Sequence, residues 1–369
     1  FPINAINYCM NGMPLDCLDL IVIDKLGIEH ESDLRKILSK HFEITKHIPI
    51  ILLNHHHAHA ASAFWVSPFD RAAILIVDGY GSIDSRSDDS FIIEETYSIF
   101  KANASEITLV ERAVSRPGWS RGIGMAYSDA TLRLGFKYGH EGKTMGLSAY
   151  AEPPDNMIPL FEENDGNLAL RDDHPVMPHV PHYSNPVIWK NGKPERGAVL
   201  QATIGGLPAR FNMPEVDRKY AQIAAYVQAE TEKALSQLAQ KVHELTGEEN
   251  LCIAGGCGLN SVANAKIVSL EIFDNIFIQP AASDAGIPLG TSLWGYHEYF
   301  HQPHRFSMGT ASLSRPYTKE QILSSLSCSS LHLYDFNGCY ERMCRVVAQL
   351  LSSGNIIGWF QGSSEFGPR

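Results

Sequence analysis

The fold class of this chain is indicated by ten consecutive residues, Leu251-Cys252-Ile253-Ala254-Gly255-Gly256-Cys257-Gly258-Leu259-Asn260. The first four are apolar and precede a glycine pair, which predicts a buried strand that ends in a turn. Residues 261–268 then favour a helix that opens at this turn. Because the first N–H groups of a helix are free to bind an anion, this arrangement indicates a cradle for a phosphate or a nucleotide. The alternative is the ordinary strand-to-helix turn of any α/β domain.

The segment before this turn supports the cradle interpretation. Apolar residues recur at helical spacing over residues 223–245 and Gly247 follows, so an amphipathic helix is expected there. A helix, a strand and then Gly-Gly-x-x-x-Asn, in this order, resemble the nucleotide site of the superfold shared by actin, Hsp70 and the sugar kinases.

A second signal is the run Asn54-His55-His56-His57-Ala58-His59, which continues into small and apolar residues at 60–64. On a helix, His55 and His59 share one face, with Cβ atoms about 5–6 Å apart. Two neutral imidazoles at this spacing are a common way to hold a divalent metal ion. The alternatives are a surface histidine cluster or part of a purification tag, and an internal run that is interrupted by Ala58 counts against a tag.

Two carboxylates follow predicted strands elsewhere. Ala72–Val77 is a continuous apolar run that predicts a buried strand, and it leads into Asp78-Gly79-Tyr80-Gly81. Asp284 follows the predicted strand 276–278. Because glycine lets the backbone approach a ligand closely, Asp78 is a candidate ligand, although Asp-Gly is equally typical of a hairpin turn. Two histidines and two aspartates suit Fe(II), Mn(II) or Zn(II), and would leave coordination positions open for substrate oxygens.

Composition bounds the class of protein. The 369 residues carry a net charge of −11, with 44% hydrophobic and 19% charged residues, which describes a globular chain of two or three domains. The negative charge counts against a general nucleic-acid binder, and no apolar stretch is long enough for a membrane span. The seven scattered cysteines and the absence of a signal peptide favour a cytoplasmic location. A start at Phe1 without Met, and an end directly after a strand-like run at 356–360, indicate a fragment of a longer protein.

The middle of the chain is rich in glycine and polar groups. Gly142-Lys143-Thr144 matches the end of a P-loop, but Lys137 stands where that motif requires its first glycine. Lys143 is a candidate for contact with an anionic ligand, and the alternative is a solvated loop with a surface lysine. A short helix is expected over residues 126–134, and residues 153–214 are expected to form a lid-like insertion that faces substrate.

Taken in order, the motifs of this chain resemble those of the NodU/CmcH/TobZ-type O-carbamoyltransferases. They are His55-His56-His57-Ala58-His59-Ala60-Ala61-Ser62-Ala63-Phe64, Asp78-Gly79-Tyr80-Gly81, Gly142-Lys143-Thr144-Met145-Gly146-Leu147, Gly255-Gly256-Cys257-Gly258-Leu259-Asn260 and Gln279-Pro280-Ala281-Ala282-Ser283-Asp284-Ala285-Gly286. The terminal Gly358-Trp359-Phe360-Gln361-Gly362 and Glu365-Phe366-Gly367-Pro368-Arg369 are similar to the family's characteristic segment. The resemblance covers nearly the whole chain.

The resemblance implies an α/β protein of two parts. Residues 1–305 would form a Kae1-like domain of the ASKHA class, with ribonuclease-H-like subdomains at about 1–210 and 211–305, and residues 315–369 would begin a YrdC-like α/β domain. In the family, the YrdC-like domain makes carbamoyl-adenylate from carbamoyl phosphate and ATP, with Mg²⁺ for the ATP step. The Kae1-like domain then transfers the carbamoyl group to a hydroxyl of a small molecule such as an antibiotic or a Nod factor. A homodimer is a candidate assembly.

The resemblance also implies roles for individual residues. The metal ligands would be His55, His59, Asp78 and Asp284, with Fe(II) as the first candidate and zinc or manganese as alternatives. The adenylate and phosphate contacts would come from Lys143, Gly255, Gly256, Gly258, Asn260, Ser283, Gly286 and Arg369. The base for the acceptor hydroxyl would be His56 or His140.

Three departures from the family pattern limit these expectations. The chain begins after an early His-Asp-x-Ser segment, lacks most of the YrdC-like domain, and has Ser363 where many relatives carry arginine. We therefore expect residues 1–369 alone to release no pyrophosphate from ATP and carbamoyl phosphate.

Other functions remain as alternatives. One is tRNA threonylcarbamoylation or HypF-like carbamoyl transfer, although the acidic charge and the lack of a basic stripe count against tRNA. Another is a kinase-like or non-catalytic ASKHA protein. Kinases of that fold hold Mg²⁺ with carboxylates, so the histidine pair separates the two classes.

Overall fold

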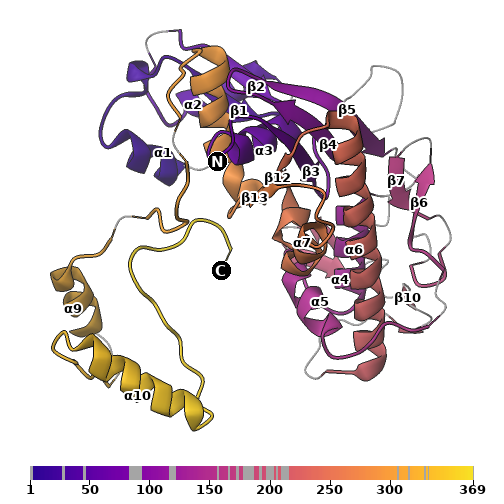
Figure 1. Ribbon diagram of the computed structural model, residues 1–369. Coiled ribbons are helices and arrows are strands. Elements are labelled where there is room, and N and C mark those ends of the chain that lie inside the picture. The colour runs from indigo at the N-terminus through magenta and orange to yellow at the C-terminus, as the bar shows by residue number, and fades with distance from the viewer. Residues whose placement is uncertain are drawn as a thin grey trace. The chain divides into compact units, whose positions relative to one another are not determined.

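The computed structural model describes most of the chain, and Figure 1 shows the arrangement of its elements. The described residues are 3–26, 30–44, 47–82, 94–115, 122–155, 158–164, 167–171, 174–177, 187–190, 193–196, 203–204, 207–208, 216–305, 307–314, 316–327, 330 and 332–368. The chain divides into two compact units, Phe1–Met308 and Gly309–Arg369.

The first unit contains a five-stranded sheet and several two-stranded ones. Its strands are β1 (Ile21–Asp24), β2 (Ile50–Leu53), β3 (Ala72–Val77), β4 (Glu94–Ala102), β5 (Ile107–Ser115), β6 (Phe161–Asn164), β7 (Asn167–Leu170), β8 (Val187–Lys190), β9 (Lys193–Arg196), β10 (Thr203–Ile204), β11 (Leu207–Pro208), β12 (Asn250–Ala254) and β13 (Asn275–Ile278). Its α-helices are α1 (Ile3–Met10), α2 (Glu31–Ser39), α3 (His55–Phe64), α4 (Ile123–Arg133), α5 (Glu141–Ser148), α6 (Arg218–Thr246), α7 (Ser261–Val268) and α8 (Ile287–Trp294). Residues Gly256–Leu259 and Asp284–Gly286 form 3₁₀ helices, and Gly295–Tyr299 form a π-helical turn.

The large sheet is mixed, in the order β13-β12-β3-β4-β5. Strand β12 pairs in parallel with both β3 and β13, whereas β4 runs antiparallel to β3 and β5. The strands predicted at 72–77, 251–254 and 276–278 are therefore confirmed, and they lie side by side. Because parallel strands end at the same edge of a sheet, this pairing brings together the segments that follow them, which contain Asp78, the Gly255-Gly256 turn and Asp284.

Strand β3 is buried along its whole length because helices cover both faces of the sheet. Ala73, Leu75 and Val77 join a core with residues of α4 and α6. Ala72, Ile74 and Ile76 join a separate core with residues of α3 and α8. A strand that is covered on both faces has no polar side, which explains the continuous apolar run in the sequence.

Local capping sets the ends of two predicted helices. Helix α6 begins after Asp217, whose side chain accepts a hydrogen bond from the Lys219 N–H, and it ends at Gly247 in the left-handed conformation. Helix α7 begins after Asn260, whose side chain accepts from the Ala263 N–H. Both helices match the sequence-based prediction, and Figure 1 shows α4, α5 and α7 gathered around the long helix α6.

Two other regions differ from expectation or remain open. Where residues 153–214 are described, they form the short antiparallel pairs β6–β7, β8–β9 and β10–β11. The role of this insertion as a lid stays a prediction. The helix expected at 126–134 is confirmed as α4, which begins three residues earlier, at Ile123.

The second unit contains α9 (Lys319–Ser327) and α10 (Tyr340–Ser352), and none of its described residues is buried. The prediction of a strand at 356–360 is wrong, since these residues belong to no strand and Ile356 is 99% exposed. A strand persists only where a neighbour pairs with its backbone and covers one face. The described part of this unit offers no other strand as that neighbour.

Candidate metal centre

Helix α3 carries the histidines and is held firmly at its first turn. The Asn54 side chain accepts a hydrogen bond from the His57 N–H at 2.9 Å and donates to the Glu95 carboxylate at 2.8 Å. Small residues at 58 and 60–63 let the helix pack closely, so that His55, His56 and His59 are fully buried. The run of small residues in the sequence thus places imidazoles inside the protein rather than on its surface.

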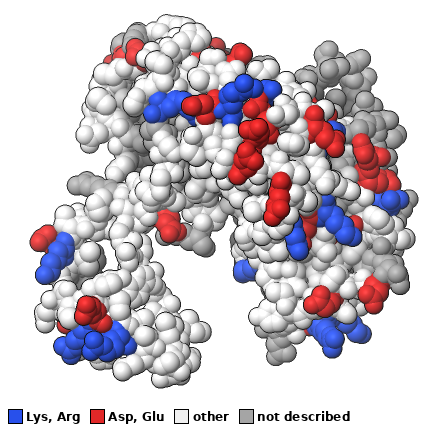
Figure 2. Space-filling model, in the orientation of Figure 1, with Lys and Arg blue, Asp and Glu red and all other residues white. Residues whose placement is uncertain are grey.

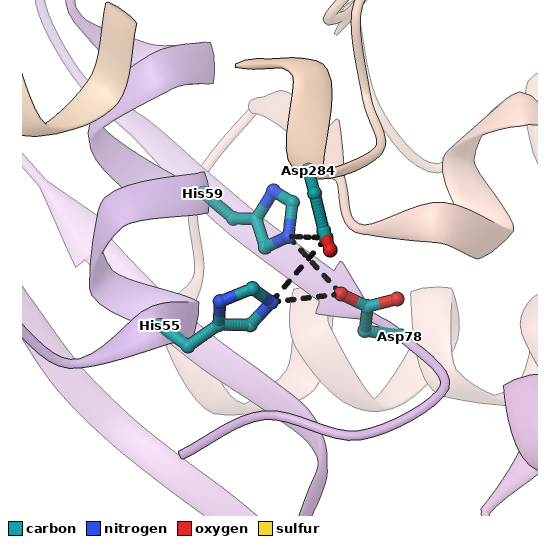
Figure 3. A group of neighbouring side chains, drawn as sticks. All are labelled: His55, His59, Asp78 and Asp284. Carbon is teal, nitrogen blue, oxygen red and sulfur yellow. Dashed lines mark hydrogen bonds and ion pairs between the residues drawn. The ribbon is translucent and has the colours of Figure 1, made fainter. Parts of the chain in front are cut away.

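The structure brings together all four side chains that were predicted as metal ligands, from three elements (Figure 3). His55 Nε2 lies 3.2 Å, and His59 Nε2 3.0 Å, from Asp78 Oδ2. The same two nitrogen atoms lie 3.5 and 3.6 Å from Asp284 Oδ1. The four ligand atoms all lie within 4.8 Å of one another.

These separations fit a metal ion at the centre of the group. Nitrogen and oxygen ligands bind zinc or similar ions at about 2.0–2.2 Å, so neighbouring ligand atoms stand about 3.0–3.5 Å apart. The observed contacts of 3.0–3.6 Å match this spacing. Imidazole and carboxylate donors accommodate iron, manganese and zinc alike, so the donor set does not name the ion.

Asp78 is oriented by its second carboxylate oxygen. Oδ1 accepts hydrogen bonds from the N–H groups of Gly79 at 2.7 Å and Gly256 at 3.1 Å, which leaves Oδ2 for the histidines. Gly255 has a φ of +87°, and a Cβ there would collide with the Val77 carbonyl. The glycine turn, whose role as a phosphate cradle stays a prediction, therefore orients a candidate ligand of the metal centre.

Asp24 is a further residue of the centre, and sequence reasoning missed it. Its Oδ2 lies 2.9 Å from His55 Nδ1, on the side of the ring that faces away from Asp78. The available signal was the apolar run Ile21–Ile23 ending in an aspartate, which repeats the pattern of Ala72–Val77 followed by Asp78. A metal-bound histidine commonly donates its other N–H to such a carboxylate.

The charges of the group reinforce one another. Burial lowers the pKa of His55, but the hydrogen bonds to Asp24 and Asp78 outweigh it and raise that pKa to about 10. Burial likewise opposes the charge of His59, and its bonds to Asp284 and Asp78 raise its pKa. Burial opposes ionisation of Asp78, yet the two histidines hold its pKa well below the usual range. Without metal, the raised pKa values favour the protonated form of both imidazoles, and a divalent cation would replace these protons.

Exposure is uneven around the centre. The side chains of His55 and His59 are 0% exposed and that of Asp78 is 12% exposed, whereas that of Asp284 is 70% exposed. The centre therefore opens to solvent at Asp284.

His56, a predicted catalytic base, lies apart from the four ligands. Its Nδ1 shares a hydrogen bond with Ser98 Oγ at 2.8 Å, and its Nε2 is buried without a partner among the described residues. A Cβ on Gly81 would stand 2.6 Å from this Nε2, so the glycine packs directly against the ring. Burial lowers the pKa of His56 well below its usual value, which keeps the ring neutral.

The other predicted site residues are placed as follows. His140 is half-buried at the N-cap of α5, and Lys143 is exposed in the first turn of that helix. Asn260 caps α7 and exchanges two hydrogen bonds of 3.0 Å with the Gln228 side chain.

Ser283 precedes the 3₁₀ helix that carries Asp284, and a Cβ on Gly286 would collide with the Ala281 carbonyl. Gly258 packs against Ala282, and Arg369 lies outside the described residues.

Comparisons with known proteins agree with the sequence motifs. Residues 31–293 match the family described as Carbamoyltransferase N-terminus. The chain is 35% identical over 342 residues to the uncharacterized protein sll1178 of Synechocystis sp., covering 88% of this chain and 50% of that protein. It is 27% identical over 330 residues to the nodulation protein NolO of Bradyrhizobium diazoefficiens, covering 86% of this chain and 51% of that protein. The chain thus spans about half the length of these curated relatives.

Among solved structures, full-length HypF in the phosphate- and nucleotide-bound form aligns with 74% of this chain and 46% of its own, at 14% identity and a TM-score of 0.42. A likeness of this extent establishes neither fold nor activity. Within the part of the chain that the structure describes, every helix is too short or too polar to cross a lipid bilayer.

Proposed function

This chain belongs to the carbamoyltransferase family, and on that premise we propose that it takes part in ATP-dependent O-carbamoyl transfer at a metal centre formed by His55, His59, Asp78 and Asp284. The observation that carries the proposal is the convergence of two imidazoles and two carboxylates, three of them buried, around one point that opens to solvent. Fe(II) is the first candidate ion, with zinc and manganese as alternatives.

The proposed substrates follow from the family. Carbamoyl phosphate and ATP would give carbamoyl-adenylate, and the carbamoyl group would pass to a hydroxyl of a small molecule. Several relatives are named nodulation proteins, which favours a Nod factor or another secondary metabolite as the acceptor class. On the face that Figure 2 shows, basic and acidic side chains are interspersed, which favours a small acceptor over tRNA.

The residues of the centre have distinct proposed tasks. A bound metal ion supplies Lewis-acid catalysis, polarising the carbamoyl carbonyl group. Asp78 is held by two backbone N–H groups, so one carboxylate oxygen stays directed at the centre. Asp284 stands at the exposed rim, where substrate would enter.

For the base that accepts the proton of the acceptor hydroxyl, we propose His140 rather than His56. Both nitrogen atoms of His56 are buried, and one is engaged by Ser98. His140 is only partly buried. Tyr138 stands two residues before His140, and after burial the charges of Tyr80, Glu141, Asp78 and Asp284 are the causes that raise its pKa.

We propose that the Gly255–Asn260 turn, the Ser283–Gly286 loop and Lys143 contact the adenylate. The polar atoms of Asn260 are engaged by Gln228 and by the helix cap, so the backbone of the turn is the better candidate for contact. The mixed sheet, with an antiparallel meander of β3, β4 and β5 beside parallel β12 and β13, supports a ribonuclease-H-like subdomain of the ASKHA class. The YrdC-like identity of residues 315–369 rests on the sequence motifs.

Elemental analysis of the purified protein tests the proposal. We expect about one equivalent of metal in the wild type, and none in His55→Ala or His59→Ala, because each variant removes one ligand. His57→Ala is the matched control, since His57 lies on the same helix but pairs with Glu298 at 3.2 Å. It should keep its metal.

Activity then separates the candidate functions. With carbamoyl-adenylate and a hydroxyl acceptor, carbamoylated product should form only in proteins that retain metal. A wild type without stoichiometric metal, even after reconstitution, would leave the histidines as packing groups and favour a kinase-like or binding function.

A further inference from the structure

The two ligand histidines differ in what surrounds their second ring nitrogen. His55 Nδ1 lies 2.9 Å from Asp24 Oδ2. His59 Nδ1 is buried and has no hydrogen-bond partner among the described residues. Both rings are fully buried, and both direct Nε2 toward Asp78 and Asp284 (Figure 3). Among the described residues, therefore, His55 has a hydrogen-bond partner at Nδ1 and His59 has none.

Asp24 is itself fixed in place. It is the last residue of β1, and in the parallel pair with β2 it stands opposite Leu53. Its Oδ1 accepts a hydrogen bond from the Leu26 N–H at 3.1 Å, and the Lys25 N–H donates to the Leu53 carbonyl at 2.8 Å. Only 18% of its side chain is exposed. The carboxylate is thus held on both sides, with Oδ2 left for His55.

The same strand pair explains why Asp24 meets His55. Strand β2 ends at Leu53, and α3 begins two residues later at His55. Because Asp24 is paired with Leu53, the end of β1 lies beside the start of the histidine helix. The position of Asp24 therefore follows from the β1–β2 pairing.

We propose that Asp24 is a positioning residue of the metal centre, which accepts the Nδ1–H of His55 and so keeps the Nε2 lone pair directed at the metal ion. This inference rests on the proposed metal centre. A carboxylate in this position fixes the tautomer and the ring orientation and makes the imidazole a stronger donor. Among the described residues His59 has no such partner at Nδ1, so its orientation depends on helix packing and on the contacts of its Nε2 with Asp78 and Asp284.

Metal affinity of the purified protein, measured by competition with a chromogenic chelator, tests this role. Removal of a residue of this kind commonly costs about 10–100-fold in metal affinity, so we expect a loss of that size in Asp24→Ala. Asp24→Asn keeps an oxygen acceptor for Nδ1–H but loses the charge, and it should show a smaller loss. Asp33→Asn, an exposed carboxylate on α2, is the matched control and should bind as the wild type does.

A second readout separates positioning from general stability. In Co(II)-loaded protein, the visible absorption bands should change in Asp24→Ala and be largely preserved in Asp24→Asn, whose near-isosteric side chain also covers the case in which the alanine variant does not fold. Wild-type affinity and wild-type bands in both variants would overturn the role of Asp24 and leave the metal centre standing. A wild-type protein that binds no metal would instead remove the centre, and this role with it.

Discussion

The two sides of the metal centre are built differently. On one side, His55, His59 and Asp78 come from α3 and from the end of β3, and their side chains are at most 12% exposed. On the other side, Asp284 comes from a 3₁₀ helix of three residues and is 70% exposed. The contrast indicates that packing holds three candidate ligands in place, whereas the fourth stands where the centre meets solvent.

The largest expected difference between the two sides is in stability without metal. Asp78 faces two buried histidines, so Asp78→Ala removes the buried carboxylate that both rings share and should lower the free energy of unfolding by about 3–5 kcal/mol. Asp284→Ala removes an exposed carboxylate and should cost about 0–1 kcal/mol. Urea unfolding in the presence of a chelator measures both values. Equal losses would show that the buried and the exposed carboxylate contribute alike to stability.

A smaller loss of stability is expected from a substitution at the contact between helices α3 and α8. Helices α3 and α8 meet so closely that a Cβ on Gly290 would collide with the Ala58 carbonyl and lie 3.0 Å from the Ser62 nitrogen. Gly290→Ala should therefore destabilise the protein by about 1–3 kcal/mol. It should also weaken metal binding, because α8 directly follows the 3₁₀ helix that carries Asp284.

Gly146→Ala, in helix α5, is the control for that substitution. A Cβ at Gly146 would meet nothing within 4 Å, so alanine there should be neutral or stabilise by up to about 1 kcal/mol. Thermal unfolding of the two variants gives the comparison. Similar melting temperatures would show that the α3–α8 contact can adjust without cost.

The smallest expected effect is the release of protons from His55 and His59 when a metal ion binds. The pKa of His55 is raised from 6.5 to about 10, and that of His59 is also raised. In the metal-free protein the His55 contribution to stability is complete below pH 6.5 and is lost as the pH rises toward 10. An incoming cation must displace these protons, so metal affinity should rise with pH, by up to about tenfold per unit for each proton.

Titration calorimetry at neutral pH, in two buffers of different ionisation enthalpy, counts the released protons. Asp284→Ala should still release the His55 proton, because the bonds of that ring to Asp24 and Asp78 remain. Metal uptake at pH 7 with no proton release would show that the imidazoles are already neutral.

Elements with a strong local pattern were predicted well. The continuous apolar run of β3, the helical spacing of α6 with Gly247 behind it, and the start of α7 at Asn260 all appear where the sequence placed them. Each depends on periodicity or on a cap within a few residues. The run at 356–360 has similar local character but forms no strand, because local β preference needs a partner strand to act on.

By itself, the sequence determined which chemical groups are present and their local spacing. The interval of four residues puts His55 and His59 on one helix face, and the positions of Asp78 and Asp284 in segments that follow predicted strands made them candidates. Only the tertiary structure decided that Asp24 reaches His55 and that His56 packs against Gly81. It also decided that, of the four candidate ligands, only Asp284 is exposed. The reason is physical: helix and strand geometry is set by neighbouring residues, whereas hydrogen-bond partners and burial depend on which distant segments of the chain pack together.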